Sequence, residues 1–129
     1  MIGILLVTHG EIGKSLIDCA AHILGKSINQ LECIPIDPKS DLQECEKYIE
    51  NEIKNLDMGT GVLIMTDIYG ATPSNILKKY SSRDNIEVIT GLNLAMVIQA
   101  ITSRDGSLSD TTNKCLESAE DGIINMSKK

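Results

Sequence analysis

The pattern of apolar and polar positions along the chain predicts four buried strands separated by amphipathic helices. Near-continuous apolar runs, typical of strands buried on both faces, lie at residues 2–7, 31–36, 61–66 and 86–89. Between the first three runs, apolar residues recur at helical spacing: Ile12, Leu16, Ile17, Ala20, Ile23 and Leu24, then Leu42, Cys45, Ile49, Ile53 and Leu56. A further helical stripe follows the fourth run, at Leu94, Val97, Ile98 and Ile101.

Residues with helix-capping chemistry set the expected helix boundaries. The candidate N-caps are Ser40, Thr72 before Pro73, Asn93, and Ser109 or Asp110. The helix that begins at Thr72 is expected to run to about Lys79. Gly25 and Gly122 are expected to end the first and the last helix.

The alternation of strands and helices predicts an α/β fold with a parallel sheet and helices on both of its faces. The 129 residues are expected to form a single domain, residues 1–129. Ligands of such folds bind beyond the carboxyl ends of the strands, where the strand order reverses. The residues that directly follow each strand are therefore the candidates for function.

The composition of the chain indicates which classes of partner are unfavourable and in which cellular compartment the protein is expected. The formal net charge of -6 at pH 7 disfavours binding to nucleic acid or to an anionic membrane. The longest apolar stretch is too short to span a bilayer and lacks the marks of a signal peptide, so we expect a cytoplasmic protein. The cysteines have no metal-type spacing and are expected to be reduced: Cys19, Cys33, Cys45 and Cys115.

A histidine and an aspartate follow two of the expected strands. His9 comes after the first strand and Asp67 after the third. If these strands are neighbours, the two side chains lie side by side at one edge of the sheet. A carboxylate that accepts a hydrogen bond from one ring nitrogen fixes the tautomer and leaves the other nitrogen free as a nucleophile. Each residue alone is more typical of an ordinary loop or turn, and it is their combination that predicts a catalytic pair.

The segment from Gly70 to Asn75 adds an expected anion site. Its small residues let a ligand approach the backbone closely, and the helix predicted to start at Thr72 directs unpaired N–H groups toward the same edge. The sequence has neither a Walker-type GxxxxGK[ST] motif nor GxGxxG, so no nucleotide site is expected. A metal at His9 and Asp67 would need a third ligand, so we expect neither a metal nor another cofactor.

Three motifs at three strand ends resemble a known family. They are Thr8-His9-Gly10, the run from Thr66 to Asn75 (TDIYGATPSN), and the run from Gly91 to Met96 (GLNLAM). In this order, they resemble the IIA component of the mannose/fructose/sorbose family of the bacterial phosphoenolpyruvate-dependent sugar phosphotransferase system. The resemblance covers essentially the whole chain.

The resemblance implies a strand order, a reaction and two partners. The expected order is 2-1-3-4 in a three-layer sandwich. The histidine phosphocarrier protein would phosphorylate His9, which would pass the phosphate to a IIB component that feeds a sugar permease. Asp67 would orient His9, and the loop around the phosphate would comprise Gly70, Ala71, Thr72 and Ser74. The chain would thus act as a phosphotransferase that is at most peripheral to a membrane permease.

Several alternatives stay open on sequence alone. Because the sequence ends at Lys129 without a linker, the IIB acceptor is expected to be a separate chain. The domain is also compatible with a stand-alone regulatory module that senses phosphorylation, with a phosphoryl donor to a dihydroxyacetone kinase, or with a small-molecule binding domain without a covalent step. The sequence does not name the sugar.

The C-terminal tail predicts self-association. Ile123, Ile124 and Met126 follow Gly122, and three large apolar side chains in a short tail are expected to be covered. As a strand, they would shield the open edge beyond the fourth strand, and the resemblance places such a strand antiparallel on a partner's sheet, which gives a homodimer. The alternative is that the last helix continues through Asn125 and packs on its own domain.

Overall fold

The four apolar runs form one parallel sheet in the computed structural model, which describes residues 1–128. The strands are β1 (Gly3–His9), β2 (Leu31–Ile36), β3 (Val62–Thr66) and β4 (Ile86–Ile89). Their order is β2-β1-β3-β4, and all three pairings are parallel. Because β2 and β3 lie on opposite sides of β1, the strand order reverses at β1. The expected fold class and strand order are confirmed.

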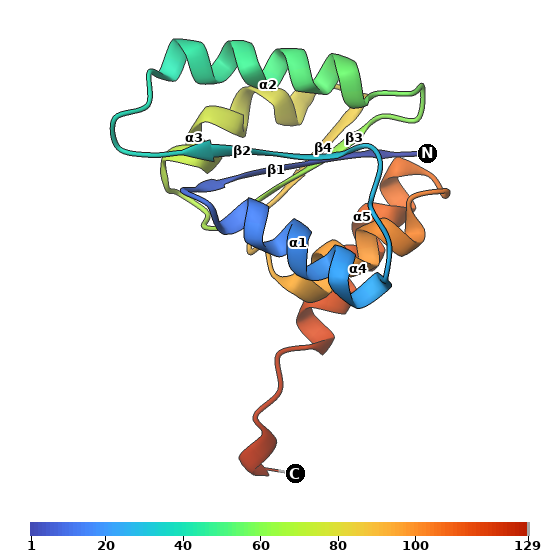
Figure 1. The fold of residues 1–129 in the computed structure, drawn as a ribbon. Coiled ribbons are helices and arrows are strands. Elements are labelled where there is room, and N and C mark those ends of the chain that lie inside the picture. Colours follow the sequence, from blue (N-terminus) through green and yellow to red (C-terminus); the bar gives the residue numbers. More distant parts are fainter. Residues whose placement is uncertain (129) are drawn as a thin grey trace.

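Helices cover both faces of the sheet, as Figure 1 shows. The elements are α1 (Ile12–Leu24), α2 (Leu42–Leu56), α3 (Thr72–Leu77), the 3-10 helix η1 (Lys78–Ser82), α4 (Leu94–Ser103), α5 (Leu108–Asp121) and the 3-10 helix η2 (Met126–Lys128). Alternate residues of β1 face opposite layers. Leu5 and Val7 pack with α2 and α3, whereas Ile4 and Leu6 pack with α1, α4 and α5. Both faces of β1 and β3 are buried, which explains why these two strands are almost continuously apolar, whereas the edge strands β2 and β4 are only partly buried and each contain a glutamate.

Two of the expected helix boundaries are confirmed by their caps. Gly25 ends α1 with φ of 69°, a left-handed conformation that glycine adopts without strain. Asn93 caps α4, where its side-chain oxygen accepts a hydrogen bond from the Met96 N–H at 3.0 Å.

Three expected N-caps are wrong by one or two residues. Asp41, not Ser40, caps α2 by accepting from the N–H groups of the second and third helical residues, while the Ser40 hydroxyl accepts from the Asp37 N–H instead. Ser107 caps α5 in place of Ser109 or Asp110. At α3, Thr72 is the first helical residue, and the N-cap is Ala71, which has no capping side chain.

A buried arginine closes the end of the sheet away from His9. Arg104 is 6% exposed, and its guanidinium donates to the carbonyl oxygens of Ile2, Asn29 and Gln30. These bonds satisfy a buried cation and hold the start of β1 against the loop before β2. The amino ends of the strands are thus filled by structural contacts, and the carboxyl ends are left for a site.

The expected antiparallel edge strand is not formed in the described chain. The helix α5 ends at Asp121, so it does not continue through Asn125 either. Residues 123–125 have no regular structure, and the tail projects from the body of the domain in Figure 1. Ile123 and Met126 are 80% and 85% exposed. A single copy therefore offers the tail no surface to cover it.

The helices of residues 1–128 include none with the length and apolarity that crossing a membrane requires.

Candidate active site

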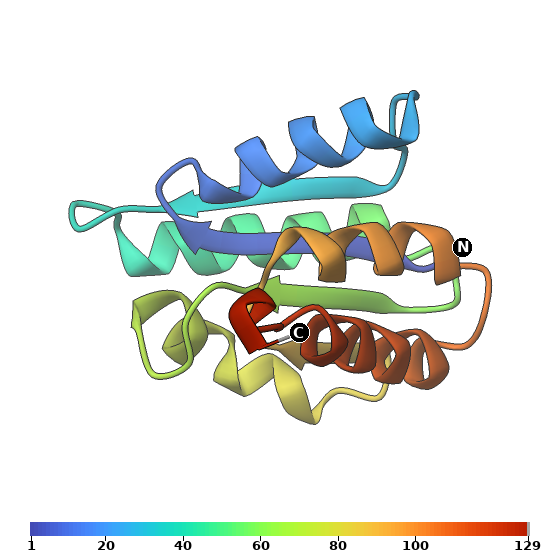
Figure 2. The same ribbon diagram turned by 90° about the horizontal axis from the view of Figure 1, so that it is seen from below.

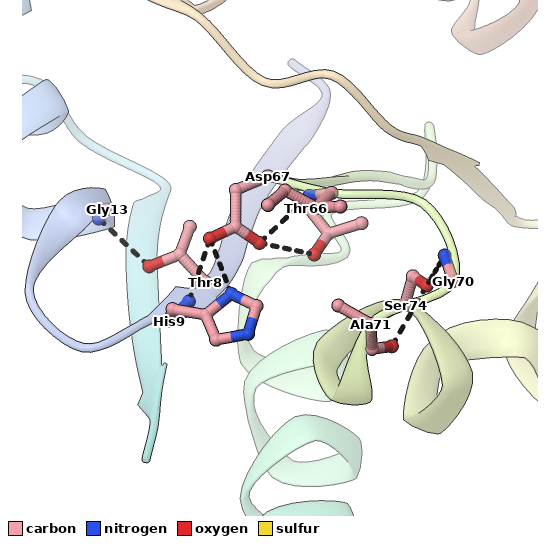
Figure 3. Close-up of polar contacts among 9 residues, drawn as sticks. Thr8, His9, Gly13, Thr66, Asp67, Gly70, Ala71 and Ser74 are labelled. Carbon is pink, nitrogen blue, oxygen red and sulfur yellow. Dashed lines mark hydrogen bonds and ion pairs between the residues drawn. The ribbon is translucent and has the colours of Figure 1, made fainter. Parts of the chain in front are cut away.

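His9 and Asp67 meet at the carboxyl end of the sheet because β1 and β3 are neighbours. The register pairs Val7 with Thr66, so the end of β1 at His9 lies beside Asp67, which directly follows β3. The Nδ1 atom of His9 lies 2.9 Å from Oδ2 of Asp67, and the backbone N–H of His9 donates to the same oxygen at 3.0 Å. Figure 3 shows both contacts. The structure thus brings the two residues together as expected.

The second oxygen of Asp67 is held by its own neighbours. Oδ1 accepts from the backbone N–H of Ile68 at 3.0 Å and from the hydroxyl of the buried Thr66 at 3.4 Å. Burial raises the pKa of the Asp67 carboxyl, but the bonds from the backbone and ring of His9 outweigh burial, and the net pKa lies below its usual value. Asp67 is therefore a carboxylate at neutral pH, with both oxygens fixed.

This carboxylate determines the tautomer of the His9 ring. An ionised Asp67 can only accept, so Nδ1 carries the proton that it donates. In the neutral ring, Nε2 is then the atom with a free lone pair, and Figure 3 shows it turned away from Asp67. The His9 side chain is 46% exposed, whereas that of Asp67 is 10% exposed. The ring is thus about half-exposed, and the carboxylate bonded to it is shielded.

His9 opens into a hollow of about 450 Å³. Its walls are His9, Ile36, Asp37, Pro38, Ser40, Leu42 and Thr72. Three of these residues, Asp37, Pro38 and Ser40, belong to the loop between β2 and α2, which the sequence analysis did not assign to the site. The strand order indicates that these loop residues belong to the site. Because β2 lies beside β1, the residues after β2 lie at the same edge of the sheet as His9.

Of the four expected phosphate-binding residues, Thr72 lines this hollow with His9. Gly70 and Ala71 lie on the loop before α3, and Ser74 lies in the first turn of α3 (Figure 3). There, the Ser74 hydroxyl accepts from the Gly70 N–H at 2.8 Å and donates to the Ala71 carbonyl at 3.1 Å. Gly70 has φ of 84°, a conformation that strains residues with a side chain. These three residues shape the loop that presents Thr72.

The hollow is neutral to acidic rather than basic. Within residues 1–128, its lining includes no lysine or arginine, and Asp37 adds a carboxyl group. The Asp37 carboxylate accepts from the Lys39 N–H at 2.8 Å, which turns the loop. The described residues also contain no group of three His, Cys, Asp or Glu side chains placed to hold a metal ion. A ligand here would meet hydroxyl groups, backbone amides and the His9 ring.

Comparison with known proteins gives one family. The model of the family described as "EIIA-man: PTS system fructose IIA component" matches residues 3–120. The mannose-specific EIIAB component of the PTS system of Escherichia coli K12 is 27% identical over 127 residues, which are 95% of this chain and 38% of that protein. This chain therefore spans less than half the length of that relative.

Two further relatives are single IIA components. The fructose-specific EIIA component of the PTS system of Bacillus subtilis strain 168 is 24% identical over 115 residues, which cover 88% of this chain and 78% of that protein. The crystal structure of phosphotransferase system component EIIA from Streptococcus agalactiae covers 100% of both chains with a TM-score of 0.88 and 25% identity. The fold and its length thus match a solved IIA component over the whole chain.

Proposed function

This chain belongs to the family of PTS system fructose IIA components, and we propose that it is a phosphoryl carrier that takes phosphate on Nε2 of His9 and passes it to another protein. The observation that carries the proposal is the bond between His9 Nδ1 and Asp67 Oδ2 at 2.9 Å. This bond leaves Nε2 as the only ring nitrogen with a free lone pair, on a side chain that is 46% exposed and lines the hollow.

The transfer is a displacement at phosphorus between two imidazoles. The Nε2 lone pair attacks the phosphorus of a phosphorylated donor, a new N–P bond forms, and the donor's own bond to phosphorus breaks with its electron pair. The proton on Nδ1 stays in place, so the phosphorylated ring carries a positive charge. The fixed Asp67 carboxylate stabilises that charge without reorganising. Transfer to the acceptor follows the same steps with His9 as the leaving group.

The surroundings of His9 favour release of a bound phosphate to an acceptor over tight retention of it. The Thr72 hydroxyl, which is exposed in the same hollow as His9, is placed to donate to a phosphate oxygen. The walls of the hollow supply no lysine or arginine within residues 1–128, so the phosphate gains no strong ion pair on this chain. A weakly held phosphate on an imidazolium is ready to leave. A basic group for the phosphate would then come from the protein that docks.

We assign the donor and acceptor by the same family relationship. The proposed donor is the histidine phosphocarrier protein, and the proposed acceptor is a IIB component. A regulatory sensor would accept phosphate on His9 by the same chemistry without passing it to a IIB protein, and a donor to a dihydroxyacetone kinase would pass it to a different acceptor. Acceptor assays therefore separate these functions, whereas assays of His9 phosphorylation do not.

A homodimer is the proposed state of assembly. Ile123, Ile124 and Met126 are exposed in a single copy, and β4 has one neighbour in the sheet and an open outer edge. If each tail pairs as an antiparallel strand with β4 of a second copy, both unpaired surfaces are covered by one two-fold arrangement.

Mass measurement of the intact protein tests the proposed function. After incubation with phosphoenolpyruvate and the two general phosphocarrier proteins of the system, the mass is expected to rise by one phosphate that is labile in acid and stable in alkali. The His9→Ala variant is expected to gain no phosphate. The His22→Ala variant is the control and is expected to be phosphorylated like the parent, because His22 is exposed on α1 away from the hollow. Equal phosphorylation of His9→Ala and the parent would refute the proposal.

A further inference from the structure

A second hollow lies between the outer edge of the sheet and α2. Its volume is about 400 Å³, and its walls are Glu32, Cys33, Ile34, Pro35, Ser40, Asp41, Glu44, Cys45, Tyr48 and Glu52. We call this hollow the edge groove. Ser40 lines both the edge groove and the hollow at His9, so the two hollows adjoin at this residue. Nothing in the phosphoryl carrier chemistry described above uses the edge groove.

One wall of the edge groove is an unpaired strand edge. The sheet order leaves β2 with a single neighbour, and Figure 2 shows β2 at the margin of the sheet. The carbonyl of Gln30 accepts from the Ile4 N–H of β1, and that of Ile36 accepts from Gly10 just after β1, so the backbone groups of the even-numbered residues of β2 face β1. The backbone groups of the odd-numbered residues, Leu31, Cys33 and Pro35, consequently point outward. They are free to pair with an added strand.

The other wall and the rim carry acidic side chains. Four carboxylates line the edge groove, from Glu32, Asp41, Glu44 and Glu52, and its lining within residues 1–128 includes no lysine or arginine. The lining also includes Tyr48, which is 64% exposed. A second copy of this acidic chain is disfavoured here, because its own β2 would bring like charges against these carboxylates. The charge instead matches a segment that carries lysine or arginine.

From this combination we infer that the edge groove binds an extended, lysine- or arginine-bearing segment of another protein, which adds as a strand to β2. Backbone hydrogen bonds to Leu31 and Cys33 supply affinity, and the carboxylates select basic side chains. Pro35 has no N–H, so pairing is confined to the first part of β2, which limits the segment to a short strand. Through Ser40, a protein bound in this way lies directly beside His9.

Two cysteines make the binding measurable on the natural sequence. Cys33 lies on the unpaired strand β2 and borders the edge groove, with its half-buried side chain packed toward α1, whereas Cys19 is exposed on α1 and does not line the groove. The probe is a synthetic peptide of alternating lysine and valine, and the control peptide alternates glutamate and valine. The lysine peptide is expected to slow the alkylation of Cys33 several-fold and to leave that of Cys19 unchanged. Hydrogen exchange of the Leu31 and Cys33 amides is expected to slow in parallel.

Charge variants identify the groove as the binding surface. Replacing Glu44 and Glu52 by glutamine is expected to weaken peptide binding by roughly two- to fivefold for each carboxylate. The matched control replaces Glu117 and Glu120, two exposed glutamates of α5, and is expected to bind like the parent. Alkylation of Cys33 at the same rate with and without the lysine peptide would overturn the inference. Peptide binding that leaves exchange of the Leu31 and Cys33 amides unchanged would overturn the strand addition.

This inference stands apart from the proposed function. Phosphorylation of His9 is read by intact mass without any peptide, and peptide binding is read on unphosphorylated protein. A negative result in one measurement therefore refutes only the proposal that it tests and does not affect the other proposal.

Discussion

The same oxygen of Asp67 accepts hydrogen bonds from both the backbone N–H and the ring Nδ1 of His9, at 3.0 and 2.9 Å. A side chain that is bonded at its backbone and at its ring has little freedom to rotate. In the proposed mechanism, the orientation and the tautomer of the His9 ring are thus set before a phosphate arrives, which lowers the entropic cost of reaching the transition state.

Replacing this carboxylate by an amide is expected to slow phosphoryl transfer. Asp67→Asn removes the negative charge that stabilises the phosphorylated ring and no longer fixes the tautomer. We expect the rate of transfer from the phosphorylated donor to fall by roughly 10²-fold, because misplaced reacting groups reduce rates by about this factor. Rapid-quench measurement of phosphate incorporation reports the rate, and circular dichroism verifies the fold.

A second carboxylate in the same hollow provides the control for this variant. Asp37 lines the hollow, but its carboxylate bonds to the Lys39 N–H and not to His9. Asp37→Asn is therefore expected to change the rate only slightly. Equal slowing by the two substitutions would mean that Asp67 acts only through the charge of the hollow, and not by orienting His9.

The pKa of Asp67 predicts where stability depends on pH. Because the bonds from His9 hold this pKa below its usual value, the carboxylate stabilises the folded state fully above about pH 4, the pKa of an aspartate in the unfolded chain. The contribution is lost as the pH falls through the lower pKa of the folded state. Urea unfolding of the parent and of Asp67→Asn is expected to differ by about 1–2 kcal/mol at pH 6. A difference that does not shrink toward pH 3 would contradict this assignment.

The hydroxyl of Thr72 is expected to contribute to phosphate binding. Thr72→Val keeps the shape of the side chain and removes the donor, so transfer to His9 should slow by about tenfold, the effect of one hydrogen bond to a charged group. Thr102→Val is the control, because the Thr102 hydroxyl is exposed on α4 and bonds only to the Gln99 carbonyl at 3.2 Å. Identical rates for Thr72→Val and the control would exclude Thr72 from the site.

The exposed tail predicts a dimer that depends on its apolar side chains. Light scattering of the full chain is expected to give twice the monomer mass, and a chain truncated after Asp121 is expected to be a monomer. Ile123→Glu should also dissociate the dimer, whereas Ser127→Glu, in the same tail, should not. A full chain that stays monomeric at high micromolar concentration would refute the dimer and leave the chemistry of His9 unaffected.

The strands were predictable because burial on both faces leaves a simple signal. The run from Ile2 to Val7 is apolar at every position except Gly3, and the structure buries all of it. Helix starts were harder, since neighbouring residues have the same capping chemistry. Ser40 and Asp41 can both cap a helix, and the choice depends on the turn before them, where the Ser40 hydroxyl is already bonded to Asp37. That contact is not encoded in any local pattern.

The site was only partly predictable for a related reason. His9 and Asp67 follow strands, so a rule about strand ends finds them. Asp37 and Ser40 also follow a strand, but their place beside His9 depends on β2 being the neighbour of β1. The expected strand order did place β2 beside β1, but Asp37, Pro38 and Ser40 are ordinary turn and capping residues, so nothing in the sequence marked them as the second wall of the hollow.

The position of the phosphate on the His9 ring tests the account most directly. Nitrogen-15 and phosphorus-31 NMR of the phosphorylated protein distinguish a phosphate on Nε2 from one on Nδ1. Because Asp67 binds the Nδ1 proton, we predict that the phosphate is on Nε2 of His9 and that the Nδ1–H resonance persists in the phosphorylated form. A phosphate on Nδ1, or on a residue other than His9, would contradict the central claim.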